Sequence, residues 1–286
     1  MIQTIAIIGT GLMGYPMSKN ISKKFKLKVY NRTFERMKGL DQSGIIICKS
    51  IEQVCENSNI IISMLPDDKA VLETVKKVSK HIQSGSIFID MSSTKVSTAV
   101  KCSKILKLLS VDFLDAPVSG GAIGAEAGTL VTMMGGDRGA VDRLIPVLEN
   151  YTSRQLHLGE SGQGSIAKLC NQIAQVITIQ GVAEAMAFAR SMGGDADAVR
   201  DVMLSGFASS RMLELQGPRM TASNYEPGME TRLLEKDSRI ALTAALAEGL
   251  DLPALELTHD RLVTACGNGW DKKDVAILYE LMTRKK

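Results

Sequence analysis

Short apolar runs alternate with amphipathic stretches of helical period along the first 158 residues of the chain. The apolar runs have the length of strands and lie at residues 4–8, 27–30, 44–47, 59–64, 86–91, 111–115, 129–134 and 154–158. The helical stretches between them lie at residues 12–24, 34–41, 51–57, 67–81, 95–109 and 137–149. Such alternation is typical of βαβ units, whose parallel sheet is buried on both faces. The pattern therefore predicts an α/β domain with a doubly wound, mostly parallel sheet that extends to about residue 158.

The strand pattern stops after residue 158, and only helical periodicity follows. A helical pattern from Ser165 to about Met192 would be about 40 Å long at about 1.5 Å per residue, which suits a helix that joins two domains. Gly193 and Gly194 end this pattern, and Asp195 is a good N-cap for the next helix. Further helices are expected at residues 196–205, 207–221, 230–249, 253–267 and 271–283. We therefore expect an all-α domain at residues 165–286 after an α/β domain at residues 1–164.

The composition is that of an ordinary globular protein, with 45% hydrophobic and 23% charged residues among 286. The five cysteines are dispersed and contain no C-x-x-C pair, and the three histidines lie far apart, so neither a disulfide framework nor a metal cluster is expected. A net charge of +3 gives no nucleic-acid footprint. No apolar run approaches the ~18 residues of a membrane span, and the first residues lack the layout of a signal peptide. These features predict a cytoplasmic, metal-free protein without nucleic-acid or membrane partners.

A glycine motif, Gly9-Thr-Gly-Leu-Met-Gly14, follows the first predicted strand and opens the first predicted helix. In this setting G-x-G-x-x-G predicts a Rossmann-like domain that binds a dinucleotide. Gly9 permits the tight turn, Gly11 lets the backbone approach a pyrophosphate, and Gly14 lets the helix pack closely on the strand. The helix start at Leu12 and Met13 offers unpaired N–H groups and a partial positive charge to phosphates. The alternative is a glycine-rich turn that binds nothing.

The end of the second predicted strand selects among dinucleotides. NAD-binding proteins usually have Asp or Glu there, ~20 residues after the glycine motif, to bind the ribose 2′-hydroxyl. This chain has Asn31, which would not repel a 2′-phosphate, then Arg32, which can pair with one, and Thr33, which adds a hydroxyl. Arg36 could reinforce the contact. We therefore favour NADP(H) over NAD(H), and FAD is disfavoured; the alternative is that Thr33 only caps the next helix and Arg32 is a solvated charge.

A second candidate site follows the strand expected at residues 111–115. In Asp115-Ala-Pro-Val-Ser-Gly-Gly121, Ser119 supplies a hydroxyl, and Gly120 and Gly121 leave their backbone N–H groups unshielded by side chains. Such a nest of N–H groups suits a small carboxylate. A plain turn after a strand is the alternative.

A polar stripe lies on the long predicted helix, among apolar neighbours. Lys168, Asn171, Gln172 and Gln175 have the spacing of one helix face. Such a stripe is costly on a buried helix unless it is partnered or functional, and the alternative is a lysine whose stem is buried while its amine reaches solvent. Residues 235–237, Glu-Lys-Asp, lie in a later predicted helix and by themselves indicate an exposed charge cluster.

Taken together, these stretches resemble the β-hydroxyacid dehydrogenase family, which includes 3-hydroxyisobutyrate dehydrogenase and tartronate semialdehyde reductase. The matching pieces follow the family's order over nearly the whole chain: residues 9–17, 63–66, 88–93, 115–121, 159–172 and 236–237. The resemblance implies a Rossmann-like domain followed by an all-helical domain, with the active site in the cleft between them.

The resemblance also implies roles for individual residues. Lys168 would be the catalytic lysine. The substrate carboxylate would lie against Ser119, Gly120 and Gly121, with Asn171 nearby. The nicotinamide side of the cofactor site would be lined by Leu65, Pro66 and Ser93, and Lys236 would reach in from the helical domain.

The chain departs from the family pattern at three positions. The family often has Asn four residues after the lysine, where this chain has Gln172, so the hydrogen-bonding role is open between Asn171 and Gln172. Ser93 stands where Thr is common, and Met229 stands where Phe is usual. The lining of the pocket, and with it the identity of the substrate, is therefore left open.

The implied activity is an NADPH-dependent interconversion of a small β- or γ-hydroxy acid and its semialdehyde, of the 3-hydroxyisobutyrate, tartronate semialdehyde or succinic semialdehyde type. Protonated Lys168 would give a proton to the developing alkoxide, and neutral Lys168 would remove it in the reverse direction. The alternatives are an imine-reductase-like enzyme, whose members generally lack the lysine, and a non-catalytic dinucleotide-binding module. The family's helical domains pair between subunits, and the stretch from Ser165 to Met192 is apolar around much of its circumference, so a homodimer or homotetramer is expected.

Overall fold

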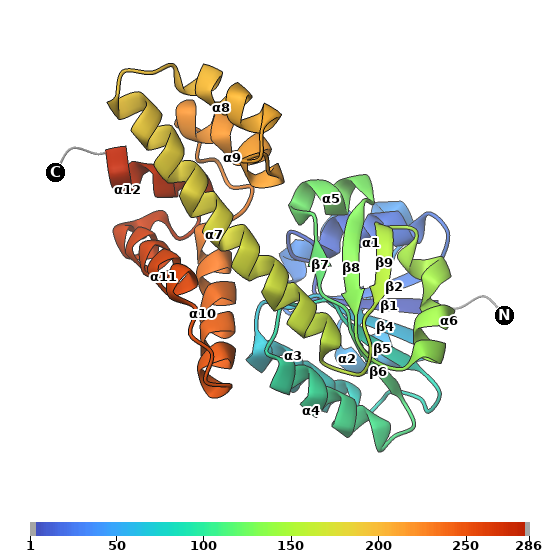
Figure 1. Ribbon diagram of the computed structural model, residues 1–286. Helices are drawn as coiled ribbons and strands as arrows, with labels where there is room; N and C mark the ends of the chain where they lie inside the picture. Colours follow the sequence, from blue (N-terminus) through green and yellow to red (C-terminus); the bar gives the residue numbers. More distant parts are fainter. Residues whose placement is uncertain (1–3, 284–286) are drawn as a thin grey trace. The chain divides into compact units, whose positions relative to one another are not determined.

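The computed structural model describes residues 4–283 of the chain. The chain divides into two compact units, Met1–Lys168 and Leu169–Lys286 (Figure 1). One helix, α7 (Gln163–Ser191), begins in the first unit and continues through the second. The predicted long helix is therefore confirmed, and it begins two residues earlier and ends one residue earlier than expected.

The first unit contains a six-stranded, wholly parallel sheet with the strand order β3-β2-β1-β4-β5-β6. Its strands are β1 (Thr4–Ile8), β2 (Lys26–Tyr30), β3 (Ile46–Ile47), β4 (Ile60–Ser63), β5 (Ile87–Asp90) and β6 (Asp112–Asp115). This is the Rossmann order, and the predicted fold class is confirmed. The order reverses between β1 and β4, and ligands of such sheets bind at that point, outside the carboxyl ends of the strands.

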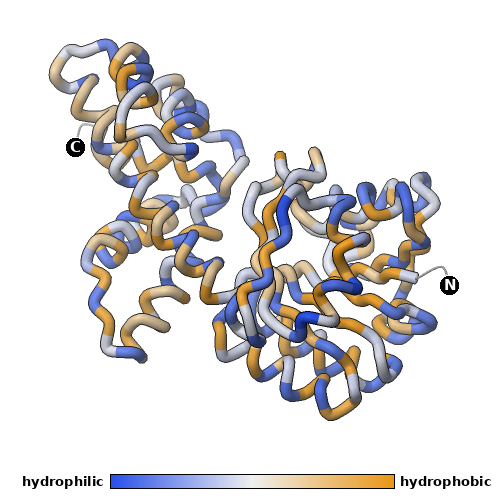
Figure 2. Tube along the Cα trace, turned by 45° about the vertical axis from the view of Figure 1, so that its right-hand side comes forward, coloured by the Kyte–Doolittle hydropathy of each residue, from blue (hydrophilic) through white to orange (hydrophobic). Residues whose placement is uncertain are grey.

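Helices cover both faces of this sheet: α1 (Gly14–Ser22), α2 (Ile51–Cys55), α3 (Asp68–Val78), α4 (Val96–Lys107) and α6 (Arg138–Leu148). Side chains alternate along β1, so Ile5 and Ile7 pack with Met17 of α1 on one face, and Ala6 packs with Val71 of α3 on the other. In Figure 2 the hydrophobic positions run through the interior of this unit, and the hydrophilic ones are concentrated on its loops and outer helices.

The sequence pattern predicts one sheet that extends to about residue 158, but the main sheet ends at β6. Instead β7 (Val118–Ser119), β8 (Leu130–Met134) and β9 (Thr152–His157) form a separate three-stranded sheet in that order. The ladder of β6 ends because the chain turns at Ala116 and Pro117, and Pro117 has no N–H to donate. The backbone after that turn pairs antiparallel with β8, and the hydroxyl of Thr132 donates to the carbonyl of Ala116 (3.0 Å). The later strands are thereby drawn away from the main sheet.

Three further segments differ from the prediction. The helix expected at residues 34–41 is two 3₁₀ turns, Phe34–Met37 and Asp41–Ser43, separated at Gly39, which has a φ of +84°. A short helix, α5 (Gly121–Ala127), lies where a loop was expected. The single helix expected at residues 271–283 is a 3₁₀ segment, Val275–Tyr279, followed by α12 (Glu280–Thr283).

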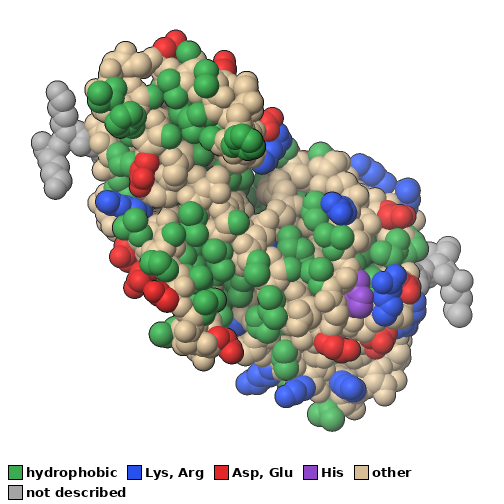
Figure 3. All heavy atoms as spheres, in the orientation of Figure 1, with side chains coloured by type: hydrophobic (Ala, Val, Ile, Leu, Met, Phe, Trp, Pro, Cys, Tyr) green, Lys and Arg blue, Asp and Glu red, His purple; other side chains and the backbone are tan. Residues whose placement is uncertain are grey.

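The second unit is helical and contains, besides α7 and α12, the helices α8 (Ala196–Ser205), α9 (Arg211–Thr221), α10 (Thr231–Ala247) and α11 (Pro253–Ala265). Hydrophobic side chains gather on the face of this unit that Figure 3 shows. Within the unit as a whole, the most exposed large hydrophobic side chains are those of Phe188, Met192, Val202, Phe207 and Leu246, each at least 67% exposed. Across residues 4–283, no helix combines the length and apolar character that crossing a membrane requires.

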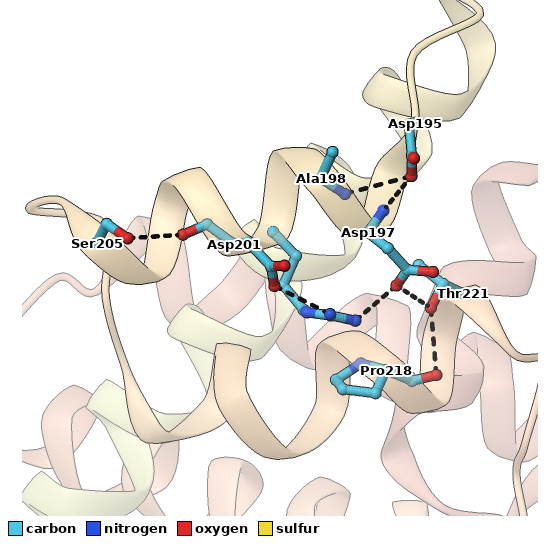
Figure 4. Close-up of polar contacts among 8 residues, drawn as sticks. Asp195, Asp197, Ala198, Asp201, Ser205, Pro218 and Thr221 are labelled. Carbon is cyan, nitrogen blue, oxygen red and sulfur yellow. Dashed lines mark hydrogen bonds and ion pairs between the residues drawn. The ribbon is translucent and has the colours of Figure 1, made fainter.

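Polar contacts connect α8 to α9 (Figure 4). The carboxylate of Asp195 accepts the N–H groups of Asp197 (3.0 Å) and Ala198 (3.2 Å), which confirms Asp195 as the N-cap of α8. The hydroxyl of Thr221, at the end of α9, donates to the carboxylate of Asp197 (3.1 Å). These contacts fix the start of α8 and connect it to the end of α9, and none of them involves the polar stripe of α7.

Candidate active site

The glycine loop follows β1, and its glycines are required for different reasons. Gly9 has a φ of +102°, and a Cβ there would collide with the carbonyl oxygen of Met64. A Cβ on Gly14 would collide with the carbonyl oxygen of Gly9, so this glycine permits the helix to pack on the loop. Gly11 faces open space, because a Cβ there would meet only the guanidinium of Arg36, at 3.7 Å. The loop is therefore tightly packed at both ends and open at its middle.

The start of α1 is available to a ligand. The helix begins at Gly14, two residues later than expected, with Met13 at its N-cap and no side chain capping it. Leu12 is 55% exposed beside it. Nearby, the hydroxyl of Thr10 is buried without a hydrogen-bond partner, which is unfavourable unless a ligand or water supplies one. An anionic dinucleotide fits both features.

Asn31 connects the glycine loop to the end of β2. Its side-chain oxygen accepts the N–H of Thr10 (3.1 Å), and its side-chain nitrogen donates to the carbonyl of Thr33 (2.9 Å). Thr33 stands at the N-cap of the 3₁₀ turn but its hydroxyl makes no capping hydrogen bond. Arg32 and Arg36 are exposed, and neither forms an ion pair with any described residue. Neither guanidinium group is therefore held by an ion pair with a described residue, and that of Arg36 lies beside the open part of the glycine loop.

The carboxyl ends of β4 and β5 carry the residues expected on the nicotinamide side: Leu65, Pro66 and Ser93. Leu65 lies against the glycine loop, since its Cδ2 would be 3.2 Å from a Cβ on Gly9. Its backbone N–H donates to the hydroxyl of Ser92 (2.9 Å), which in turn donates to the carboxylate of Asp90 (2.6 Å). Asp90 is fully enclosed, and this burial raises its pKa to about 6 even though hydrogen bonds from Ser92 and Ser63 oppose the shift.

The expected carboxylate-binding residues lie at a helix start rather than in a plain loop. Ser119 ends β7, Gly120 is the N-cap of α5, and Gly121 is its first residue. Both glycines have positive φ, +132° and +61°, which side chains rarely tolerate. All three residues are at least partly exposed. Their N–H groups and hydroxyl are therefore accessible to a small anion.

Lys168 lies on α7, one turn after the helix start, and is 8% exposed. The carboxylate of Asp115, at the end of β6, accepts the N–H groups of Gly162 and Ser165, each at 2.7 Å. Burial raises the pKa of Asp115, while these hydrogen bonds act against the shift. The helix start that carries Lys168 is thus held by the strand that leads to Ser119.

The amides of the α7 stripe are hydrogen-bonded to one another and to residues of the helical unit outside α7. The side chain of Gln172 donates to the carboxylate of Asp237 (2.7 Å), and Asn171 donates to the side-chain oxygens of Gln172 (3.0 Å) and Gln175 (3.4 Å). Gln175 lies against the sulfur of Met229 (2.9 Å). Met229, the position that departs from the family pattern, therefore borders this stripe.

The interpretation of residues 235–237 as an exposed cluster is wrong: Glu235 and Lys236 are only partly exposed, and Asp237 is buried. Asp237 is 5% exposed, and the side chain of Lys236 is 17% exposed with its amine 3.2 Å from Asp237. Asp237 has the spacing of the buried face of α10, together with Leu234, Ser238 and Ala241. That helical period is a signal from which the burial of Asp237 could have been found.

Comparison with known proteins adds to this geometry. Residues 4–159 match the family described as the NAD binding domain of 6-phosphogluconate dehydrogenase, and residues 162–282 match the NAD-binding family of NADP-dependent 3-hydroxyisobutyrate dehydrogenase. The chain is 34% identical to 2-hydroxy-3-oxopropionate reductase of Escherichia coli, with 99% of each chain covered. It is 30% identical to mitochondrial 3-hydroxyisobutyrate dehydrogenase of Drosophila melanogaster, over 99% of this chain and 90% of that one.

A solved structure of a protein with one of these names has the same fold as this chain. The structure of Mycobacterium tuberculosis 3-hydroxyisobutyrate dehydrogenase with L-serine has a TM-score of 0.93 and 27% identity, and covers 99% of this chain and 100% of that one. Both matched families are nicotinamide-dinucleotide-binding domains, and together they account for nearly the whole chain. The chain therefore binds a nicotinamide dinucleotide.

Proposed function

Because the chain belongs to the β-hydroxyacid dehydrogenase family and is an NAD(P)-dependent hydroxyacid oxidoreductase, we propose that it uses NADP(H) to interconvert a small carboxylate-bearing semialdehyde and its hydroxy acid. The observation that carries this proposal is Lys168, buried on a helix whose start is fixed by a carboxylate at the end of a sheet strand. A module that only binds a dinucleotide needs no such side chain, whereas reduction of a carbonyl group needs a proton donor.

The preference for NADP(H) rests on the end of β2. A 2′-phosphate would lie beside Asn31, which is neutral, and would receive charge-assisted hydrogen bonds from Arg32. Thr33 is free to add its hydroxyl because it makes no capping bond, and Arg36 stands over the same open part of the loop. The pyrophosphate would be held by the backbone from Gly9 to Gly14 and by the uncapped start of α1.

The remaining residues would orient the reacting groups. The cofactor supplies the hydride when bound, and its nicotinamide half would lie against Leu65, Pro66 and Ser93, with Lys236 as a further contact from the helical unit. The hydroxyl of Ser119 and the N–H groups of Gly120 and Gly121 would hold the substrate carboxylate. Lys168 would donate a proton to the oxygen of the aldehyde as negative charge develops there, and remove it in the reverse direction.

The choice between the two amides favours Asn171 as the substrate contact. Gln172 is 5% exposed and commits its side-chain nitrogen to the buried carboxylate of Asp237. Asn171 is only half-buried and is bonded to neutral amides of its own helix. Gln172 would then act by fixing Asn171, whose side-chain nitrogen donates to it.

Initial rates test this function. We expect turnover of NADPH with at least one member of a panel of glyoxylate, tartronate, methylmalonate and succinate semialdehydes, and slower turnover with NADH. Cyclic imines at the same concentrations serve as the comparison, because the imine-reductase alternative predicts turnover with those compounds instead. A protein that binds NADPH tightly but reduces none of these compounds would be a binding module, and the proposal would be wrong.

The helical unit supports self-association. Its exposed large hydrophobic side chains include Phe188 and Met192, which are four residues apart at the end of α7, and Phe207. A contiguous exposed apolar surface is typical of a protein–protein interface. We propose a homodimer or homotetramer that buries them. Light scattering at micromolar concentration should give at least twice the monomer mass, and Phe207→Asp with Phe188→Asp should reduce it; a monomer mass for the unmodified chain would contradict the proposal.

A further inference from the structure

A row of polar residues crosses the main sheet where its strands end. Ser63 at the end of β4 is the register partner of Asp90 at the end of β5, and Asp90 is the register partner of Asp115 at the end of β6. All three are at most 2% exposed. Burying a carboxylate is costly unless it is paired or hydrogen-bonded, so two adjacent ones call for an explanation.

Asp90 joins two loops. One of its oxygens accepts hydrogen bonds from the hydroxyls of Ser63 (2.7 Å) and Ser92 (2.6 Å) and from the N–H of Ser92 (3.3 Å). The hydroxyl of Ser92 also accepts the N–H of Leu65 (2.9 Å). The loop after β4, which carries Leu65 and Pro66, is therefore connected through Asp90 to the loop after β5, which carries Ser93.

Asp115 joins a different pair of segments. Its two oxygens each accept one N–H from the start of α7, and its backbone exchanges hydrogen bonds with Gly135 (3.1 and 2.8 Å). Gly164 allows this close approach, because a Cβ there would collide with the carbonyl oxygens of Asp115 and Met133. Lys168 lies one turn beyond this contact, and Ser119 lies four residues beyond Asp115.

Asp115 differs from an ordinary helix cap. Asp67 and Asp137 are residues adjacent to α3 and α6 and cap those helices locally, each accepting one N–H. Asp115 is 47 and 50 residues away in sequence from the two groups that it binds. A local cap is enough to start a helix, whereas a distant buried carboxylate also fixes where the helix lies on the sheet.

We propose that Asp90 and Asp115 are positioning residues with separate roles. Asp90 fixes the two loops that face the nicotinamide half of the cofactor, and Asp115 fixes Lys168 relative to the loop that holds the substrate carboxylate. This inference rests on the proposed function of Leu65, Ser119 and Lys168. It predicts that substitutions one strand apart in the same sheet affect different kinetic constants.

The test compares Asp115→Asn with Asp90→Asn, measuring cofactor affinity by NADPH fluorescence and the semialdehyde reaction at saturating cofactor. An asparagine at 115 sets its NH₂ group against one of the two N–H groups. We expect kcat to fall roughly 10- to 100-fold, because misplacement of a reacting group by about 1 Å costs up to about 10²-fold, with the NADPH Kd within about twofold. Asp90→Asn should instead raise the NADPH Kd roughly 5- to 30-fold and change kcat less. Asp137→Asn, which weakens a local cap, should change neither constant.

Gly164→Ala provides a second route to the same result if Asp115→Asn folds poorly. The added methyl group should displace the start of α7 without altering the carboxylate, and so lower kcat while leaving NADPH binding intact. The matched control is Gly181→Ala on the same helix, where a Cβ would meet nothing within 4 Å. If Gly164→Ala lowers kcat no more than Gly181→Ala does, Asp115 does not position the helix.

Amide hydrogen exchange separates this inference from the proposed function. In the protein without substrate, residues 162–168 should exchange faster in Asp115→Asn than in the unmodified chain, and no faster in Asp90→Asn. If the wild-type protein reduces no semialdehyde, the proposed function is wrong. The positioning roles of Asp90 and Asp115 are then still tested by the exchange rates and the NADPH affinities, which need no substrate. Equal effects of both substitutions on exchange, or on Kd and kcat alike, would overturn the division of roles.

Discussion

The two ends of the candidate cofactor site are built on opposite principles. At the phosphate end, beside the glycine loop, two exposed guanidinium groups lack ion pairs within the described chain and the start of α1 has no side-chain cap. At the reaction end, where β4, β5 and β6 finish, the carboxylates are buried and accept hydrogen bonds from hydroxyl and backbone groups.

This difference shows where each end gains from the ligand. Unpaired cations and an uncapped helix start gain hydrogen bonds only when an anion arrives, so the phosphate end should govern affinity. Groups already fixed by internal hydrogen bonds require no reorganisation during the reaction, so the reaction end should govern rate. Substitutions at the phosphate end should therefore change the NADPH Kd. At the reaction end, substitutions of Lys168 and Asp115 should change kcat, whereas Asp90, which fixes the loops that face the nicotinamide, should affect mainly the Kd.

Lys168→Ala gives the largest expected effect and tests the reaction end directly. If Lys168 is the proton donor, kcat should fall roughly 10²–10⁴-fold, the usual contribution of a positioned acid–base group. The NADPH Kd should change little, because the dinucleotide would be held mainly by the glycine loop and the end of β2. Steady-state rates and fluorescence titration measure the two quantities.

Two further variants sharpen that result. Lys168→Arg should not restore activity, since a guanidinium releases its proton too poorly and has another shape. Cys170→Ala, at an exposed position on the same helix and outside the polar stripe, should behave as the unmodified protein. If Lys168→Ala retains most of its kcat, another group or water supplies the proton and the contrast between the two ends fails.

Arg32→Ala tests the phosphate end, with a smaller expected effect. Loss of one guanidinium–phosphate contact should weaken NADPH binding by about 1.5–3 kcal/mol, the range for hydrogen bonds to charged groups. NADH binding should change little, and so should kcat at saturating NADPH. Arg154→Ala, an exposed arginine on β9, is the matched control. Equal catalytic efficiency of the unmodified protein with NADPH and NADH would contradict this reading of Arg32.

The sequence predicts well those parts of the fold that local rules determine. The β1–loop–α1 unit is recognisable because Gly9 and Gly14 occupy positions where a Cβ would collide with a carbonyl oxygen. The long helix α7 is recognisable from its unbroken period. The separate sheet of β7, β8 and β9 is not, because only tertiary pairing after Pro117 decides whether a strand-like run joins β6 or leaves it.

The candidate site divides in the same way. Residues expected to contact ligands occur in short motifs, so Lys168, Ser119 and Arg32 are found by pattern and resemblance. Asp90 and Asp115 received no role from the sequence, although both lie in the stretches that carry the resemblance. Asp90 is linked to Leu65 by way of the Ser92 hydroxyl, and Asp115 is bonded to the start of α7. These linked segments are about 25 to 50 residues apart in sequence, and no local spacing rule connects them.

The smallest predicted effect concerns the pH dependence of stability and tests whether the reaction end is truly buried. Burial raises the pKa of Asp90 to about 6 in the folded chain, above the ordinary value of 3.8 that it regains on unfolding. Between these values the folded state binds more protons than the unfolded state, so the contribution of Asp90 to stability is greatest at low pH and falls as the pH rises through about 6. From pH 5 to pH 7 this amounts to about 1.4 kcal/mol, the equivalent of one pKa unit.

Asp90→Asn cannot titrate, so the difference in unfolding free energy between wild type and variant, from urea titrations, should shift by about that amount in favour of the wild type at pH 5. Burial also raises the pKa of Asp115, but Asp115 is present in both proteins, so taking the difference largely removes its contribution. An unchanged or reversed difference would mean that the hydrogen bonds from Ser63 and Ser92 outweigh burial at Asp90.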